Sequence, residues 1–202
     1  MKVTPMKKAI ATLKSVTPYS PSRYYTPEIP KLKDESPDQY DERTWRHHAH
    51  VDGKGLVIIP GECFAWAIKA ASKRRSDKIP GKRNQTFTKV FDCVEVVGNI
   101  SFGVKLADLE MEGFMANADG RRGSGTRVYR RFPILREWSG TLLFISWDDQ
   151  ITESVFTETL RDAGLLVGVG RRRPENKGFF GRFAVEAIEW HDRVEVAASL
   201  FS

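Results

Sequence analysis

Alternating apolar and polar residues, together with short apolar runs, predict the strands of this protein. A strand buried on one face carries an apolar residue at every second position, and a strand buried on both faces is apolar throughout. Several stretches show one of these patterns or are expected to be extended. They cover residues 8–18, 56–59, 86–97, 127–133, 140–147 and 183–190.

Apolar residues that recur three and four positions apart predict two helices. The first covers residues 62–76, and its basic last turn suits the negative end of a helix dipole. The second covers residues 152–163, with Thr152 as its N-cap and Gly164 as the residue that closes it. Residues 19–40 show no hydrophobic period, so we expect an extended excursion there.

The order of these elements predicts the fold class. The order matches the ferredoxin-like, or split βαβ, plan. It consists of a strand, a helix preceded by the short strand 56–59, two further strands, a helix and a last strand. We therefore expect an α+β fold, with one domain over residues 1–202. Its helices should cover one face of an antiparallel sheet. The residues left over form two expected insertions, at about 19–55 and 99–126.

Composition adds that the chain is globular. Of its 202 residues, 41% are hydrophobic and 11% aromatic, which suffices for a packed core and excludes a wholly disordered protein. No apolar run approaches the ~20 residues of a membrane helix, and no signal peptide is evident. Cys63 and Cys93 are too few for a disulfide scaffold. We expect a cytoplasmic protein without a membrane partner, with its tryptophans mainly in the core.

The distribution of charge is more informative than the net charge of +6. Residues 69–89 contain eight basic side chains and one acid, and residues 121–136 contain six arginines and no acid. Residues 171–182 contain five cations and only Glu175. Acidic residues gather elsewhere. Such segregation is typical of a face that binds a polyanion.

The glycine-rich segment 164–183 carries the most specific chemistry. Its five glycines permit positive φ angles and close approach of another backbone. Its cations can bind phosphates, and its phenylalanines can stack on unpaired bases. Because its arginines lie in a polar loop, we expect that they can be replaced without loss of the fold. The alternative is a flexible glycine hairpin with solvated arginines. The candidate nucleic-acid-binding residues here are Arg171, Arg172, Arg173, Lys177, Phe179, Phe180 and Arg182.

Two further segments could lie beside this one, unless they are ordinary Pro-Gly turns. Residues 59–61 open the first helix, whose free amides could receive a phosphate, and residues 79–83 follow that helix and contribute Lys82 and Arg83.

Residues 121–127 mix cations with small residues, which is typical of a loop that becomes ordered on nucleic acid, or else of a plain surface loop. This loop and the strand expected after it contribute Arg121, Arg122, Arg127, Arg130 and Arg131.

A cluster of histidines offers the main alternative chemistry. His47, His48 and His50 lie close together, and in an extended strand the last two would point to one side, as a metal pair does. A histidine could also act as the general base of a nuclease. A structural or nucleic-acid-contacting role is the interpretation we adopt. No cofactor and no metal is expected.

Three stretches together resemble the RAMP superfamily, the RNA-binding proteins of CRISPR effector complexes. They are a first strand ending in Ser15-Val-Thr-Pro18, a Val57-Ile-Ile-Pro-Gly61 turn that opens a helix, and the glycine-rich run 168–178 after a late helix. Glu62-Cys63 departs from the small hydroxyl residues common after that turn. The segments 44–46, 79–82 and 173–183 are also similar to proteins of tailed-phage genomes.

These observations predict a binder of single-stranded nucleic acid, with RNA slightly favoured over DNA. The resemblance implies assembly of copies along the strand, as a homo-oligomer or a RAMP-type complex. Two alternatives stay open. One is a metal-independent endoribonuclease that uses His47, His48 or His50, and the other is a protein that docks onto a CRISPR-like effector complex.

Overall fold

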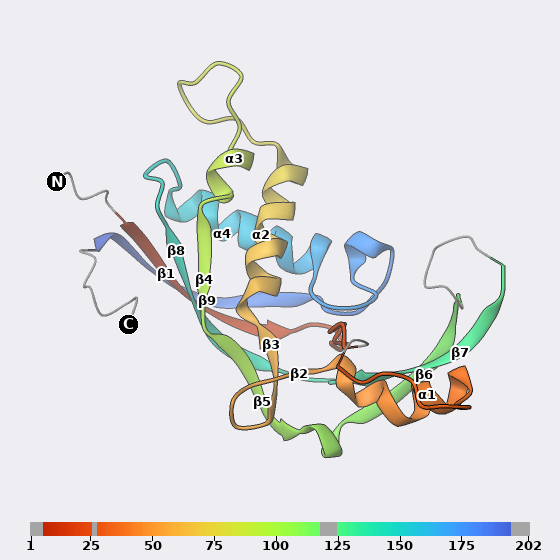
Figure 1. The fold of residues 1–202 in the computed structure, drawn as a ribbon. Helices are drawn as coiled ribbons and strands as arrows, with labels where there is room; N and C mark the ends of the chain where they lie inside the picture. Colours follow the sequence, from red (N-terminus) through yellow and green to blue (C-terminus); the bar gives the residue numbers. More distant parts are fainter. Residues whose placement is uncertain (1–5, 26–27, 118–124, 195–202) are drawn as a thin grey trace.

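The computed structural model describes residues 6–25, 28–117 and 125–194 (Figure 1). Its centre is a four-stranded antiparallel sheet in the order β4-β8-β1-β9. Two helices, α2 and α4, pack against each other and against this sheet. The elements are β1 (Met6–Ser15), α2 (Gly61–Arg75), β4 (Val94–Val97), β8 (Ser139–Ser146), α4 (Glu153–Asp162) and β9 (Phe183–Val194).

Two interleaved β-α-β crossovers produce this strand order. The first runs from β1 through α2 to β4, and β8 lies between its two strands. The second runs from β8 through α4 to β9, and β1 lies between its strands. This is the ferredoxin-like α+β fold that the order of elements predicts.

The core lies between the helices and one face of the sheet. Alternate residues of β1 are fully buried there, with Ala9 opposite Phe144 and Ala11 opposite Leu142 on β8. Phe144 meets Phe156 of α4 edge to face, at 5.3 Å between ring centres. From Ala9 to Leu13, buried residues alternate with partly exposed ones, as expected for a strand that is buried on one face.

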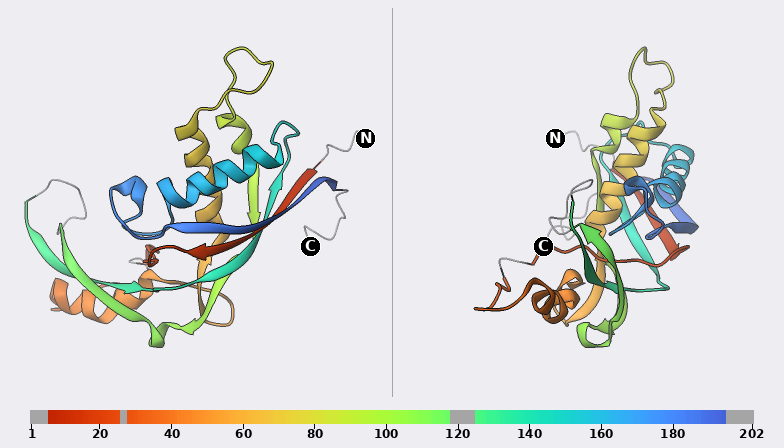
Figure 2. Two further views of the ribbon diagram at one scale, coloured as in Figure 1. Left: turned by 180° about the vertical axis from the view of Figure 1, so that it is seen from behind. Right: turned by 90° about the vertical axis from the view of Figure 1, so that its right-hand side faces the viewer.

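The chain between β1 and α2 and the chain between β4 and β8 form a second group of elements. One part is a small antiparallel sheet in the order β2-β3-β5, and another is the β6–β7 hairpin, which sweeps away from the central sheet (Figure 2). Helix α1 packs beside this hairpin. The bounds are α1 (Pro37–Thr44), the 3-10 helix η1 (Trp45–His48), β2 (His50–Val51), β3 (Leu56–Pro60), β5 (Asn99–Lys105), the 3-10 helix η2 (Leu106–Asp108), β6 (Glu110–Asn117) and β7 (Arg127–Ile134).

Three predicted elements differ from the structure. Helix α1 occupies the end of the stretch expected to be extended, and a capping box between Ser36 and Gln39 starts it. The predicted strand 86–97 begins instead with a helical turn, α3 (Thr88–Phe91), because Phe87, Val90 and Phe91 are buried at helical spacing. Helix α4 does not close at Gly164 but continues as a π-helical turn, η3 (Ala163–Val167).

No helix in the described part of the chain is long and apolar enough to cross a membrane.

Candidate nucleic-acid interface

The glycine-rich loop (residues 168–182) is held in place by backbone hydrogen bonds. Val169 N–H donates to the carbonyl oxygen of Gly181 at 2.9 Å, which closes the loop on itself. Gly181 N–H then donates to Pro18 at 2.7 Å, and Arg171 N–H donates to Ser20 at 2.7 Å. A short 3-10 helix, η4 (Pro174–Asn176), lies at its tip. The loop is therefore tied to the chain that follows β1.

Glycine is required in this loop because two backbones come too close for a side chain. A Cβ atom on Gly181 would lie 1.8 Å from the Val169 carbonyl oxygen, at a φ of +72° that favours glycine. A Cβ atom on Gly178 would lie 1.8 Å from the carbonyl oxygen of Arg172. The close backbone approach expected from the glycine density is thus present.

Arg171 is a packed residue rather than a solvated one. Its guanidinium carbon lies 4.0 Å from the centre of the Phe132 ring, on β7. Burial lowers the pKa of Arg171 to about 10, so the side chain stays charged at neutral pH. Its Nε atom is buried and has no hydrogen-bond partner among the described residues. Arg171 therefore joins the loop to the hairpin, and the expectation that it can be removed at no cost is not supported.

Arg172 lies between two aromatic rings. Its guanidinium carbon is 4.6 Å from the centre of Phe114, on β6, and 5.0 Å from the centre of Phe180. Phe114 in turn stacks on Phe132 at 4.6 Å between ring centres. Among the described residues, the Arg172 guanidinium has no acidic partner. Its N–H donors are thus oriented by the rings and available to an anion.

Arg173 borders an open pocket of about 310 Å³ beside α2. Its guanidinium carbon lies 4.2 Å from the centre of Trp66, a residue that is 43% exposed. The side chain also donates to the carbonyl oxygen of Gly170 at 3.1 Å and pairs with Glu175 at 3.2 Å. The pocket is lined by Ser22, Glu62, Cys63, Trp66, Gly168, Val169, Gly170 and Arg173.

The remaining candidate residues of the loop differ in exposure. Lys177 is exposed, and Phe179 is 68% exposed at the loop surface. Phe180 is half-buried beneath Arg172. The guanidinium of Arg182 donates to the carbonyl oxygen of Leu165 at 3.1 Å, at the end of the preceding helix. Lys177 and Phe179 are therefore the accessible members of this group.

Two arginines of β7, Arg130 and Arg131, are paired with acids of α1. Asp41 is 4% exposed and accepts a hydrogen bond from the backbone N–H of Arg131 at 2.9 Å. The guanidinium groups of Arg131 and Arg130 lie 3.4 and 3.5 Å from the same carboxylate. Arg127 is exposed and donates to the carbonyl oxygen of Met115. Arg121 and Arg122 lie outside the described residues.

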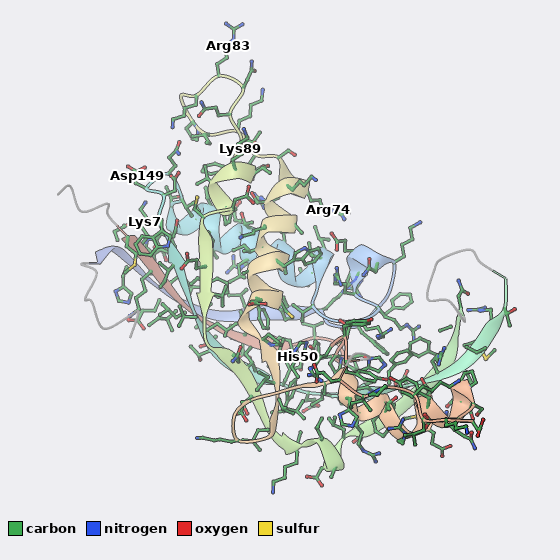
Figure 3. All side chains as sticks on the ribbon, viewed as in Figure 1. Lys7, His50, Arg74, Arg83, Lys89 and Asp149 are labelled. Carbon is green, nitrogen blue, oxygen red and sulfur yellow. The ribbon has the colours of Figure 1, made fainter. Side chains whose placement is uncertain are left out.

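The structure brings some candidates together and separates others. The glycine-rich loop meets the hairpin through Arg171 and Arg172, so these two segments form one surface. Lys82 and Arg83 lie far away, beyond the C-terminal end of α2, where Figure 3 labels Arg83 at the tip of a loop. The expectation that residues 79–83 lie beside the glycine-rich loop is wrong, because α2 separates them.

The three histidines are not arranged as a metal pair on one strand. His47 and His48 belong to η1, and only His50 lies in a strand. His48 packs on Tyr25 and Phe132, and burial followed by the nearby charge of Arg171 lowers its pKa to about 4. No group of three or more possible metal ligands occurs within residues 6–25, 28–117 and 125–194.

Sequence reasoning missed several residues of this surface. Phe132 was expected in a strand and Phe114 in the insertion 99–126, and no local pattern shows that they face the arginines of a distant loop. Trp66 was expected in the core because of its apolar neighbours, yet it is exposed beside Arg173. Asp41 carries no signal beyond the capping box at Ser36, which predicts the helix that positions it.

Comparisons with known proteins relate the fold to a chain of an RNA-bound complex. A chain in the cryo-EM structure of the Type III-B Cmr-beta bound to cognate target RNA matches with a TM-score of 0.50 and 10% sequence identity. The match covers 93% of this chain and 61% of that one, so this protein spans about three fifths of its length. At this identity the similarity concerns the fold. Neither the family models nor the curated proteins yield a match.

Proposed function

We propose that this protein binds single-stranded nucleic acid, RNA in preference to DNA, on the surface formed by the glycine-rich loop and the β6–β7 hairpin. The observation that carries the proposal is Arg172. It is held between Phe114 and Phe180 and has no acidic partner in the described part of the chain. An oriented guanidinium of this kind is suited to bidentate contact with a phosphate.

The neighbouring residues supply what a single strand needs besides a phosphate contact. Phe179, at 68% exposure, offers a ring on which an unpaired base can stack, a contact typically worth ~1–3 kcal/mol. Lys177 adds an exposed charge next to it. The pocket that Trp66 and Arg173 help to line has the size to receive a base that leaves the stack.

The choice of RNA rests on the fold. The matched Cmr-beta chain belongs to a complex bound to cognate target RNA, and three sequence stretches of this protein resemble the RAMP superfamily. This relationship also motivates the second part of the proposal, that several copies, or a copy and related subunits, assemble along one strand. Light scattering of the protein with and without RNA would test that part directly.

Binding should be measured by fluorescence anisotropy with a labelled oligouridine, over salt concentrations between about 50 and 200 mM. If about five cations neutralise phosphates, the slope of log affinity against log salt should be roughly −3.5. Arg172→Ala should weaken binding about tenfold. Arg136→Ala, which removes an exposed arginine paired with Glu110, is the matched control and should change affinity less than about twofold.

The proposal fails if the wild type does not bind at low salt, or if both arginine variants weaken binding equally. The same oligonucleotide should remain intact during incubation with and without a chelator. A cut at a defined position that requires His47, His48 or His50 would favour an endoribonuclease instead.

A further inference from the structure

A second basic surface lies at the opposite end of α2 from the glycine-rich loop. We call it the basic end. Figure 3 labels three of its members, Arg74 on the last turn of α2, Arg83 at the tip of the loop that follows, and Lys89 on α3. All of its cations are exposed. The basic end consists of Lys73, Arg74, Lys78, Lys82, Arg83 and Lys89.

Three acids beside the basic end pair with Arg75 and not with a cation of the basic end. The Arg75 guanidinium lies 2.7 Å from Asp77, 2.9 Å from Glu158 and 2.8 Å from Asp162. One inward-facing arginine thus occupies three carboxylates. Asp149 is the exposed acid that Figure 3 places at the border of this surface.

Five of the six cations of the basic end have no side-chain partner among the described residues, in contrast to Arg130 and Arg131 of β7. Lys82 donates to the side-chain oxygen of Gln150. The side chains of the other five make no hydrogen bond or ion pair with any described residue. Arg130 and Arg131, by comparison, are both paired with Asp41. The basic end therefore presents five exposed cations without a side-chain partner among the described residues.

A pocket of about 390 Å³ opens at the base of this surface. Its one carboxylate, Asp148, accepts hydrogen bonds from the backbone and side chain of Gln150 at 2.8 and 3.0 Å, so it is already engaged. Polar and apolar groups share the wall about equally. The lining residues are Ile79, Asn84, Gln85, Thr86, Lys89, Val90, Asp148 and Gln150.

We propose that the basic end is a second nucleic-acid-binding surface, which contacts the phosphate backbone without sequence preference. It goes beyond the proposed function because it does not involve the glycine-rich loop. The 15 residues of α2 separate the two surfaces by about 22 Å, at ~1.5 Å per residue. One strand that contacts both must therefore run along the molecule.

The composition of the surface favours a nucleic acid over an acidic protein. Interfaces between proteins are depleted of lysine and enriched in aromatic side chains at their centre. The basic end has four lysines and two arginines and exposes no aromatic side chain. Interfaces with nucleic acids are polar and strongly positive, as this one is.

The test compares two variants of the full chain that lose the same net charge. The first is Lys78→Ala/Lys82→Ala/Arg83→Ala/Lys89→Ala. The matched control, Lys31→Ala/Lys33→Ala/Lys54→Ala/Lys105→Ala, removes four cations that are also exposed but lie elsewhere. The probe is a labelled oligouridine of about 30 nucleotides, and the readout is affinity and its salt dependence. Thermal melting shows whether both variants are folded.

The basic-end variant should bind about tenfold more weakly or worse, and its salt slope should become shallower by ~0.7 for each phosphate contact that is lost. The control should lose less than about twofold. A variant with lysines 78, 82 and 89 replaced by arginine should bind like the wild type, because it keeps the charge.

Equal losses in both quadruple variants, or no loss in either, would overturn the proposal. It would also be overturned if a polyglutamate peptide, and not RNA, lost binding in the basic-end variant, since the partner would then be an acidic protein. Arg172→Ala separates the two proposals: a normal affinity in that variant with a loss in the basic-end variant contradicts the proposed function and leaves this inference in place.

Discussion

The guanidinium carbon of Arg171 lies 4.0 Å from the centre of the Phe132 ring, and this contact joins the glycine-rich loop to the β6–β7 hairpin. The Phe132 ring also contacts the ring of His48, and it stacks on Phe114, whose ring contacts Arg172. A single column of rings and cations thus connects η1, the hairpin and the loop. The position of the proposed binding arginine depends on this column.

Arg171→Ala should lower the stability of the protein, whereas Arg172→Ala should not. A largely buried cation over a ring contributes about 2 kcal/mol when desolvated, and replacement by alanine also removes the packing of the side chain. We expect a loss of about 1–2 kcal/mol in the free energy of unfolding for Arg171→Ala by chemical denaturation. Equal stabilities of the two variants would show that the contact with Phe132 does not anchor the loop.

Gly181→Ala should displace the glycine-rich loop and reduce RNA binding. The new Cβ would clash with the Val169 carbonyl oxygen at 1.8 Å, at a φ of +72°. Strain of this kind should cost at least about 2 kcal/mol of stability. Gly53→Ala is the control, because nothing lies within 4 Å of its Cβ. Comparable melting temperatures for the two variants would contradict the observed backbone approach.

Asp41→Asn should loosen helix α1 from the hairpin. Asp41 is 4% exposed and faces both Arg130 and Arg131, so the change leaves two cations near a neutral group. Breaking a buried pair costs about 3–5 kcal/mol, and the amide oxygen that remains should reduce this to about 2. Asp38→Asn removes an exposed partner of Arg131 and should cost less than about 0.5 kcal/mol. Hydrogen exchange of the β7 amides would report the difference.

Stability should fall as the pH drops below about 6.5, in part because of His48. Burial and the charge of Arg171 lower its pKa in the folded protein to about 4, so the unfolded chain binds a proton more readily. The favourable contribution is fully present above pH ~6.5 and is lost as the pH falls through ~4. Its upper limit is about 3 kcal/mol, from ~1.4 per pKa unit.

His48→Gln should flatten this part of the stability profile, measured by denaturation at a series of pH values. His50→Gln is the comparison, since burial also lowers the pKa of His50 but without a charge from Arg171. If the His48 variant kept the full pH dependence, other groups would account for it.

Local patterns were sufficient to predict the fold class. Alternation in β1 and β9 and the apolar spacing of α2 and α4 each report which face of an element is buried, and their order specifies the ferredoxin-like plan. One failure came where two periods coincide. Phe87, Val90 and Phe91 fit a helical turn as well as a strand, and burial on the helical face decided between them.

The sequence by itself determined that positive charge gathers in three segments and that one of these is dense in glycine. Only the tertiary structure decided which cations are available. Asp41 and Arg131 are 90 residues apart in the sequence, and no local pattern predicts their pairing. The accessibility of a charge depends on contacts between distant segments. Arg130 and Arg131 therefore proved to be paired and Arg171 packed, whereas the cations beyond α2 are exposed.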